Sequence, residues 1–238
     1  MIVAVTGASG LVGSALVSSL ESSNTRVIPL VRRAPRPGED ALRWDPSSGA
    51  ITPAGPAVAD AIVHLAGDSI MGLRWTAEKK RRIRESRTTA TRLLVQTLTQ
   101  LANPPDVLVC ASGIGYYGSR GDEVLSEESR SGTGFLAELA REWEAATATA
   151  SARGVRVVNL RLGVVLSTRG GALAKMLTPF RLGLGGVIGD GAQWMSWIAL
   201  DDVIGAIRHV IATDSLRGPV NAVAPAPVSN AEFTRTLG

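Results

Sequence analysis

Three glycines at intervals of three residues, Gly7, Gly10 and Gly13, follow a short β-branched run at residues 2–5 and precede a segment rich in alanine, leucine and valine. This order predicts a buried strand, a tight turn and a helix. Because Gly7 and Gly10 have no Cβ, backbone N–H groups at the helix start can face an anion, and Gly13 lets helix and strand pack closely. The pattern predicts a site for a dinucleotide diphosphate, although such glycines also occur in purely structural turns.

A basic pair, Arg32 and Arg33, ends the next predicted strand at residues 26–31. In a dinucleotide-binding fold the tip of this strand meets the adenosine ribose, where an acidic residue binds the 2′-hydroxyl of NAD and arginine suits a 2′-phosphate. A guanidinium donates paired, charge-assisted hydrogen bonds to phosphate. We therefore expect the cofactor to be NADP(H), the alternative being two solvated arginines that open a loop.

A second group of reactive side chains follows the predicted strand at residues 107–111. Ser112, Tyr116 and Tyr117 lie in a glycine-rich exit from that strand, where a hydroxyl and two phenols could transfer protons. The exit is the second candidate site.

Another predicted strand, at residues 61–65, ends in Ala66 and Gly67, which would let the backbone approach a ligand. Ligands of open parallel sheets bind beyond the carboxyl ends of the strands. His64 lies inside this apolar strand, so we interpret it as a core residue and not as a catalytic one.

Strands and helices that alternate along the chain must position these groups. The alternation indicates the α/β class, with a doubly wound parallel sheet of five to six strands and right-handed crossovers. Pro29 lacks an N–H and predicts a pairing gap or an irregular end in its strand. The remaining strands are predicted at residues 155–160 and 219–222 with a candidate at 41–44, and helices at residues 76–101, 133–152 and 200–213.

The character of the sequence changes at residue 166, where glycine-rich turns and tryptophans replace the regular alternation. Such irregular segments suit a lobe that covers a substrate. We expect residues 1–165 to form an NADP(H)-binding domain and residues 166–238 to form a small C-terminal lobe on the substrate side.

Composition argues against several function classes. The net charge of +4 is too small to indicate a nucleic-acid partner, and the basic excess is concentrated at residues 79–92, which we interpret as a solvated helix face. One cysteine, Cys110, and two histidines argue against a disulfide framework and a metal centre. No apolar stretch reaches bilayer length and no signal peptide is evident, so we expect a cytoplasmic protein with a small-molecule substrate and no membrane partner.

The combination of TGASGLVG, a basic strand tip, HLAG, SxxxYYG and GDGxQWxSWIxxDDV resembles the extended, or atypical, short-chain dehydrogenase/reductases. Within them the chain is most similar to the NAD(P)-binding, nucleotide-sugar epimerase-like family, also labelled cell-division-inhibitor-like. The resemblance covers nearly the whole chain. Its most specific segments are Trp44-Asp45-Pro46, Arg74-Trp75-Thr76, Ser86-Arg87, Gly115 to Gly118, Trp143-Glu144, Pro179 to Gly186 and Ala224 to Val228.

The resemblance implies a Rossmann fold of the extended short-chain dehydrogenase type and a set of site residues. Ser112 matches the serine that acts in catalysis in the relatives. We expect Tyr116 to act with it, because Tyr117 occupies the YG position that relatives also have beside their catalytic tyrosine; the alternative is that both tyrosines only line a pocket. Relatives pair through two such helices, so the apolar faces of the helices at residues 76–101 and 133–152 would permit a homodimer, the alternative being that these faces are simply core. The residues expected to hold NADP(H) are Gly7, Ser9, Gly10, Leu11, Val12, Gly13, Arg32, Arg33, Leu65, Ala66, Gly67 and Arg87.

The chain departs from its relatives at the usual proton relay, a tyrosine followed four residues later by a lysine. No YxxxK occurs in the sequence, and at the expected place on the helix Phe135 precedes Leu139. Ala199 stands where the family usually has a histidine. The family also continues several dozen residues beyond residue 238, so we expect part of the substrate lobe to be missing.

Two functions remain open on the sequence. The first is an NADP(H)-dependent oxidoreductase or epimerase that acts on a sugar-like or other small carbonyl or hydroxy compound. The second is a non-catalytic NADP(H)-binding module with a regulatory or scaffold role. Ser112, Tyr116 and Tyr117 favour the first, and the missing YxxxK favours the second.

Overall fold

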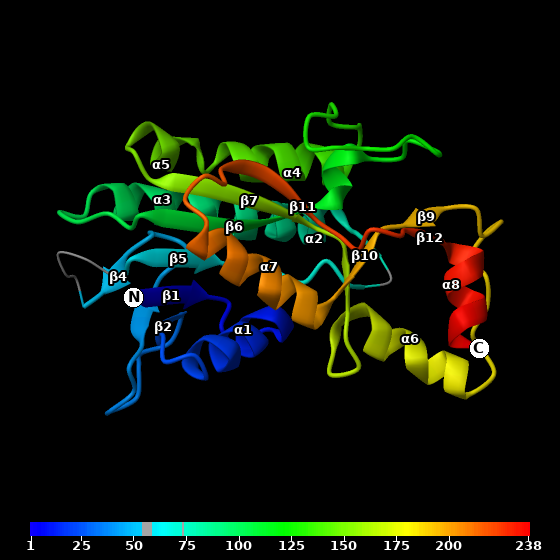
Figure 1. Cartoon of the computed structure of the whole chain (residues 1–238), viewed down its shortest axis with the longest axis horizontal. Helices are drawn as coiled ribbons and strands as arrows, with labels where there is room; N and C mark the ends of the chain where they lie inside the picture. The colour runs from blue at the N-terminus through cyan, green and yellow to red at the C-terminus, as the bar shows by residue number, and fades with distance from the viewer. Residues whose placement is uncertain (54–58, 73) are drawn as a thin grey trace.

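An eight-stranded sheet, parallel except for its last strand, forms the centre of the computed structural model, which describes residues 1–53, 59–72 and 74–238 (Figure 1). The strand order β11-β7-β6-β5-β1-β2-β3-β4 confirms the predicted α/β class and doubly wound sheet. The bounds are β1 Ile2–Thr6, β2 Arg26–Val31, β3 Leu42–Trp44, β4 Ile51–Thr52, β5 Ala61–His64, β6 Val107–Gly113, β7 Arg156–Leu162 and β11 Gly218–Ala222.

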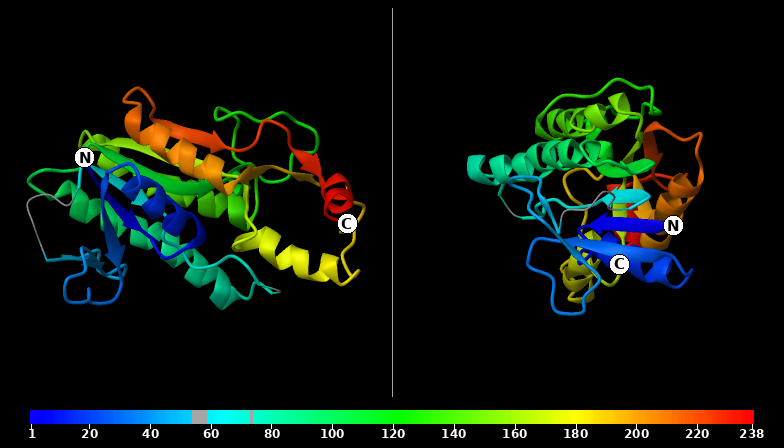
Figure 2. Two further views of the ribbon diagram at one scale, coloured as in Figure 1. Left: turned by 60° about the horizontal axis from the view of Figure 1, so that its bottom comes forward. Right: turned by 90° about the vertical axis from the view of Figure 1, so that its left-hand side faces the viewer.

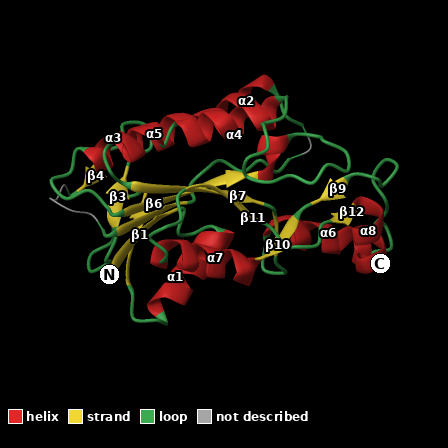
Figure 3. Ribbon diagram, turned by 45° about the horizontal axis from the view of Figure 1, so that its top comes forward, coloured by secondary structure: helices red, strands yellow, loops and turns green. Residues whose placement is uncertain are grey.

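Helices cover both faces of this sheet (Figure 3). Alternate residues of β1 point to opposite faces, so that Val3 and Val5 enter one core and Ala4 enters the other. The first core is closed by α1 (Leu11–Glu21) and α7 (Leu200–Ala212). The second is covered by α2 (Ala77–Arg84), the π-helical turn η1 (Glu85–Thr89), α3 (Ala90–Thr99), α4 (Phe135–Ala145) and α5 (Ala148–Ala152).

A smaller lobe extends beyond one end of the sheet (Figure 2, left). It contains α6 (Gly171–Arg181), the antiparallel pair β9 (Trp194–Met195) and β12 (Val228–Ser229), and α8 (Asn230–Leu237). The parallel pair β8 (Val164–Leu166) and β10 (Trp197–Ala199) joins this lobe to the sheet. Helix α7 and strand β11 also follow residue 165 in the sequence, but β11 is a strand of the main sheet and α7 packs against that sheet. A domain boundary at residue 165 would therefore divide the main sheet and its core.

Two of the predicted helices are interrupted. The helix predicted at residues 76–101 begins as expected, with the Thr76 hydroxyl accepting from Lys79 N at 3.2 Å, but η1 replaces α-helix in its middle. There the hydroxyls of Ser86 and Thr88 donate to backbone carbonyls of the preceding turn. The helix predicted at residues 133–152 divides into α4 and α5, where Thr147 Oγ1 donates to Glu144 O at 2.7 Å and competes with the helical ladder.

The predicted strands mostly match, with two differences. Strand β2 runs through Pro29, which pairs with Val5 of β1, so the prediction of an irregular strand end at Pro29 is wrong. On the other side of β2, pairing with β3 starts only at Leu30. The sheet also has more parallel strands than the five to six predicted, because both the candidate strand near residue 42 and the last strand join it.

The helices of the predicted dimer surface use their apolar side chains inside this chain. Ile83, Leu94, Leu98, Leu139 and Trp143 are all buried in the core. The homodimer therefore stays a prediction that these faces do not support. None of the helices in the described ranges is long and apolar enough to cross a membrane.

His64 is a core residue, as expected, and it joins β1, β5 and α3. The backbone N–H groups of Leu65 and Ala66 donate to Thr6 Oγ1 at 3.1 and 3.2 Å. The Thr6 hydroxyl proton is then left for His64 Nδ1, 2.7 Å away. Nε2 of His64 consequently carries the ring proton and donates to Thr91 Oγ1 at 2.9 Å. Complete burial lowers the pKa of His64 to about 4, because the imidazolium would lose its hydration.

This shift makes stability depend on pH. Between the unfolded pKa of about 6.5 and the native pKa, the unfolded chain binds a proton that the native protein does not, so stability falls as pH falls. We expect the free energy of unfolding in urea to be about 2 kcal/mol lower at about pH 5 than at about pH 7 through this group alone. His64→Gln should remove that difference, whereas His209→Gln, at the exposed histidine, should retain it. An unchanged pH dependence in His64→Gln would contradict the assignment.

Candidate functional site

The carboxyl ends of the central parallel strands meet at one edge of the sheet. Strand β1 lies at the point where the strand order reverses, with β2 on one side and β5 on the other. Open parallel sheets bind ligands at this switch point. The glycine turn, the basic strand tip and the loops after β5 and β6 all lie at this edge.

The three glycines of the turn between β1 and α1 have different surroundings: Gly7 and Gly13 lie against backbone atoms, whereas Gly10 faces a less crowded space. Gly7 has a φ of 69°, and a Cβ there would lie 2.9 Å from the Leu65 carbonyl carbon. A Cβ on Gly13 would overlap the Gly7 carbonyl oxygen and lie 2.9 Å from Ala8 Cα. Gly10 has an ordinary φ of −77°, and a Cβ there would meet only Gly7 O, at 3.2 Å. Gly10 is therefore the least crowded of the three glycines: apart from the close Gly7 oxygen, an added side chain would enter the space in front of α1.

The start of α1 presents unpaired donors to that space. Its first helical hydrogen bond runs from Ser14 N to Gly10 O at 2.9 Å. The N–H groups of Leu11, Val12 and Gly13 therefore have no acceptor within the helix. Three parallel N–H groups and the positive end of the helix dipole together favour an anion.

A pocket of about 320 Å³ opens beside this helix start. Its lining combines the turn with a loop far away in the sequence: Ser9, Gly10, Leu11, Ser14, Arg169 and Gly170. From the sequence, Arg169 is expected in the substrate lobe and not at the glycine turn. Nothing in the sequence pattern could place it here, because its approach to α1 depends on how the loop after β8 folds.

The two arginines at the tip of β2 have different surroundings. Arg33 forms a paired ion bridge with Glu39, with Nη2 and Nη1 at 2.6 and 2.8 Å from the carboxylate oxygens. These bonds and one from Arg36 N lower the pKa of Glu39 to about 2. Arg32 is exposed, and the structure gives its side chain no ion pair with any described residue. Of the two predicted phosphate ligands, Arg32 is the one whose guanidinium is available.

The side chain of Arg87 supports the loop after β5 through direct contacts with its backbone. Its guanidinium packs flat against Gly67, where a Cβ would lie 3.1 Å from Cζ. Arg87 Nη1 donates to Asp68 O at 2.9 Å, and Ser86 Oγ accepts from Asp68 N at the same distance. Both side chains come from the π-helical turn η1, which therefore aims them at the loop. The predicted residues Leu65, Ala66, Gly67 and Arg87 thus lie together at this edge.

The loop after β6 is organised by a buried ion pair that the sequence analysis did not foresee. Arg161 and Glu144 are bonded twice, at 2.9 Å each, with the arginine side chain 3% exposed. Arg161 lies within β7, which extends two residues beyond the strand end predicted at residue 160. Ser112, 4% exposed, donates to Glu144 Oε1 at 2.7 Å. The hydroxyl proton of Ser112 is therefore committed to this carboxylate.

The two neighbouring tyrosines differ: Tyr117 is buried and hydrogen-bonded, whereas Tyr116 is half-buried. Tyr117 is buried, accepts from Arg161 Nη1 at 2.9 Å and donates to Asn221 Oδ1 at 2.6 Å. Tyr116 is half-buried, and its ring stacks against the Arg161 guanidinium with Cζ 3.5 Å from the ring centre. No hydrogen bond of its hydroxyl is found among the described residues. Tyr116 is therefore the phenol that remains free to act on a ligand.

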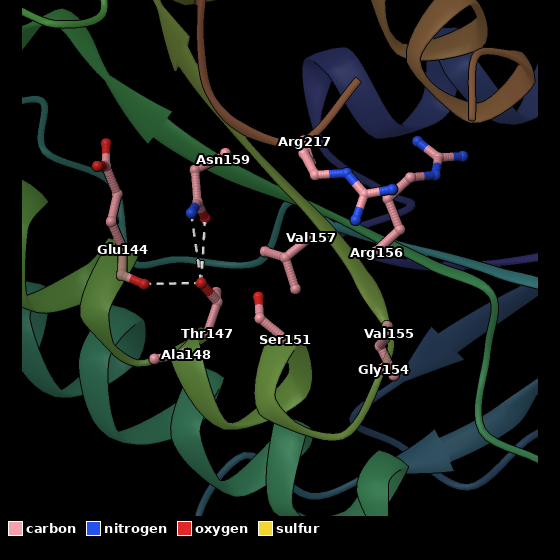
Figure 4. A pocket seen from close by; sticks show the side chains of 11 residues that line it. Glu144, Thr147, Ala148, Ser151, Gly154, Val155, Arg156, Val157, Asn159 and Arg217 are labelled. Carbon is pink, nitrogen blue, oxygen red and sulfur yellow. Dashed lines mark hydrogen bonds between the residues drawn. The ribbon is translucent and has the colours of Figure 1, made fainter. Parts of the chain in front are cut away.

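A second pocket, of about 370 Å³, lies between α5 and β7 (Figure 4). Polar side chains line it, including Thr147, Ser151 and Asn159, and Thr147 is hydrogen-bonded to Asn159. It contains none of the residues predicted for the cofactor or for catalysis. Nor do the described residues hold a group of side chains suited to bind a metal ion.

The contrast between Gly10 and Gly13 can be tested by substitution. Gly10→Val should abolish binding of NADPH in calorimetry and change stability by less than about 1 kcal/mol, because its branched side chain fills the space in front of α1. Gly13→Ala should destabilise the fold by roughly 3 kcal/mol in urea unfolding, since its Cβ overlaps backbone atoms that cannot move independently. Normal NADPH affinity in Gly10→Val would show that the turn is structural only.

Comparison with known proteins agrees with this geometry. The model of the NAD dependent epimerase/dehydratase family matches residues 3–222. An epimerase family protein from Mycobacterium tuberculosis, MT2273, is 45% identical over all of this chain and 78% of its own length. Epimerase family protein SDR39U1 from Homo sapiens is 38% identical over all of this chain and 80% of its own length.

Solved structures give the same result. The crystal structure of human SDR39U1 with NADPH aligns with a TM-score of 0.88 and 34% identity, over all of this chain and 80% of that one. A nucleoside-diphosphate sugar epimerase from Corynebacterium glutamicum aligns with a TM-score of 0.85 and 43% identity, and this chain spans 49% of it. The chain belongs to the NAD dependent epimerase/dehydratase family, whose members share an NAD(P)-binding fold.

Proposed function

We propose that this protein binds NADP(H) at the carboxyl edge of the sheet. The observation that carries the proposal is the open space at Gly10 before three unpaired N–H groups of α1. The diphosphate would lie on these groups, the adenosine ribose at the tip of β2, and the nicotinamide toward Gly67 and Tyr116. The human relative solved with NADPH supports the same choice of cofactor.

The preference for NADP(H) over NAD(H) rests on Arg32. Its exposed guanidinium at the tip of β2 is free to bind a 2′-phosphate, whereas Arg33 is held by Glu39. No carboxylate of β2 itself stands at this tip, where a 2′-hydroxyl would need one. The ion pair of Arg33 with Glu39 instead stiffens the loop that follows.

The reaction that fits this site is hydride transfer with a small carbonyl or hydroxy compound, as in an oxidoreductase or an epimerase. A bound nicotinamide would supply or accept the hydride. A proton must move in the same reaction, and Tyr116, in the turn that follows β6, has a hydroxyl without a hydrogen-bond partner among the described residues. In this assignment Ser112 acts through Glu144 and positions the loop, because its own proton is engaged.

A second candidate is a non-catalytic NADP(H)-binding module. The observation that favours it is that the hydroxyls of Ser112 and Tyr117 are both committed to buried partners. On α4, Phe135 and Leu139 stand where a tyrosine and a lysine would form the usual relay. Such a protein would bind the cofactor tightly and turn it over slowly or not at all.

Arg32 and Arg33 offer a matched pair for testing cofactor choice. Arg32→Ala should weaken NADPH binding by about 1.5–3 kcal/mol, the scale of hydrogen bonds to a charged group, and leave NADH binding nearly unchanged. Arg33→Ala should have a smaller effect on NADPH, since that guanidinium already binds Glu39. Isothermal calorimetry measures both. Equal affinity of the parent protein for NADPH and NADH would refute the preference.

Turnover distinguishes the enzyme from the binding module. With any carbonyl substrate that oxidises NADPH, Tyr116→Phe should lower the rate about 100-fold, the loss expected for a general acid. Tyr117→Phe, which removes a buried hydroxyl, should reduce stability instead. Equal rates in Tyr116→Phe and the parent would remove this phenol from the mechanism and favour the module.

A further inference from the structure

Arg169 is brought to the glycine turn by the loop between β8 and α6. The backbone of that loop packs directly on the first residue of α1: a Cβ on Gly170 or Gly171 would lie 3.5 or 3.0 Å from a δ-carbon of Leu11. Arg169 and Ser9 line the same pocket. The side chain of Arg169 is exposed, so it is free to reorient toward a ligand.

The position of this arginine is electrostatically unfavourable in the absence of an anion. The N-terminus of α1 carries the positive end of the helix dipole, and a second positive charge beside it is repelled. Within the described part of the chain, no carboxylate lies within ion-pair distance of Arg169, in contrast to Arg33, Arg120 and Arg161. An anion between the guanidinium and the helix start would satisfy both positive groups.

We propose that Arg169 binds the diphosphate of the dinucleotide from the side opposite the glycine turn. This inference rests on the proposed cofactor binding and adds a ligand that the glycine pattern does not contain. A guanidinium can donate two parallel hydrogen bonds to phosphate oxygens, so it complements the backbone donors of Leu11 and Val12. The diphosphate is then held between the sheet and the loop that leads into the lobe.

The same contact links cofactor binding to the lobe. Helix α6 begins two residues after Arg169, and none of its side chains is fully buried, so we expect it to open locally more readily than the helices of the main sheet. A diphosphate bound by Arg169 would tether the start of α6 to α1. Cofactor binding should therefore slow amide hydrogen exchange in α6 as well as in the glycine turn.

Calorimetry with NADPH and NADH tests the assignment. Arg169→Ala should weaken both cofactors by the same factor, about 10- to 100-fold, because both carry the diphosphate. Arg169→Lys should give an intermediate loss, since it keeps the charge and loses the fork. Arg217→Ala is the matched control: it removes an exposed arginine beside the start of β11, at the opposite edge of the sheet, and should change neither affinity.

The outcomes separate this inference from the proposed function. A parent protein that binds neither cofactor overturns both. A parent that binds, with Arg169→Ala binding equally well, overturns only the role of Arg169. A loss confined to NADPH would place Arg169 on the 2′-phosphate and also refute contact with the diphosphate. Protection of α6 on NADPH binding should be present in the parent and absent in Arg169→Ala, and urea unfolding should show that the variant remains folded.

Discussion

The close approach of α1 to the turn after β1 is the constraint on which the rest of the structure depends. Gly13 meets the Gly7 carbonyl with no room for a Cβ, and Gly7 in turn lies against the backbone of Leu65. These two contacts fix the helix over the sheet, where Leu16 completes the core beneath it. They also aim the helix start at the carboxyl edge. The fold and the anion site are therefore produced by the same packing.

A second interaction, the buried pair of Arg161 and Glu144, determines what the edge can do chemically. Removing one partner of a buried pair commonly costs about 3–5 kcal/mol, because the other charge is left without compensation. The pair therefore requires further hydrogen-bond partners, and it takes them from Ser112 and Tyr117. The hydroxyls of Ser112 and Tyr117, two of the three candidate catalytic groups in the sequence, are therefore engaged in hydrogen bonds that stabilise the loop. Tyr116 remains free because the arginine contacts its ring and not its hydroxyl.

The supports of the site come from elements that break the regular pattern. The π-helical turn places Arg87 against the loop after β5. Helix α4 ends at Ala145, and Thr147, two residues further along, donates to the carbonyl of Glu144. His64 and Thr6 hold the neighbouring ends of β1 and β5 through side-chain hydrogen bonds. Buried polar groups of this kind are stable only when each has a partner, which is the case for this chain of hydroxyls and imidazole.

The sequence by itself determined the α/β class, the order of most strands and helices, the glycine turn and the core position of His64. These features follow from local periodicity and from residues whose conformational demands are short-range, so they can be read along the chain. The tertiary structure alone decided that Arg33 is engaged while Arg32 is free, and that Ser112 is committed to Glu144. It also decided that Arg169 lies at the start of α1. Ser112 and Arg169 depend on contacts between segments distant in sequence, and the ion pair of Arg33 depends on how the loop that follows β2 folds back to bring Glu39 to it. No linear pattern records which charged side chains will find a partner when the chain folds.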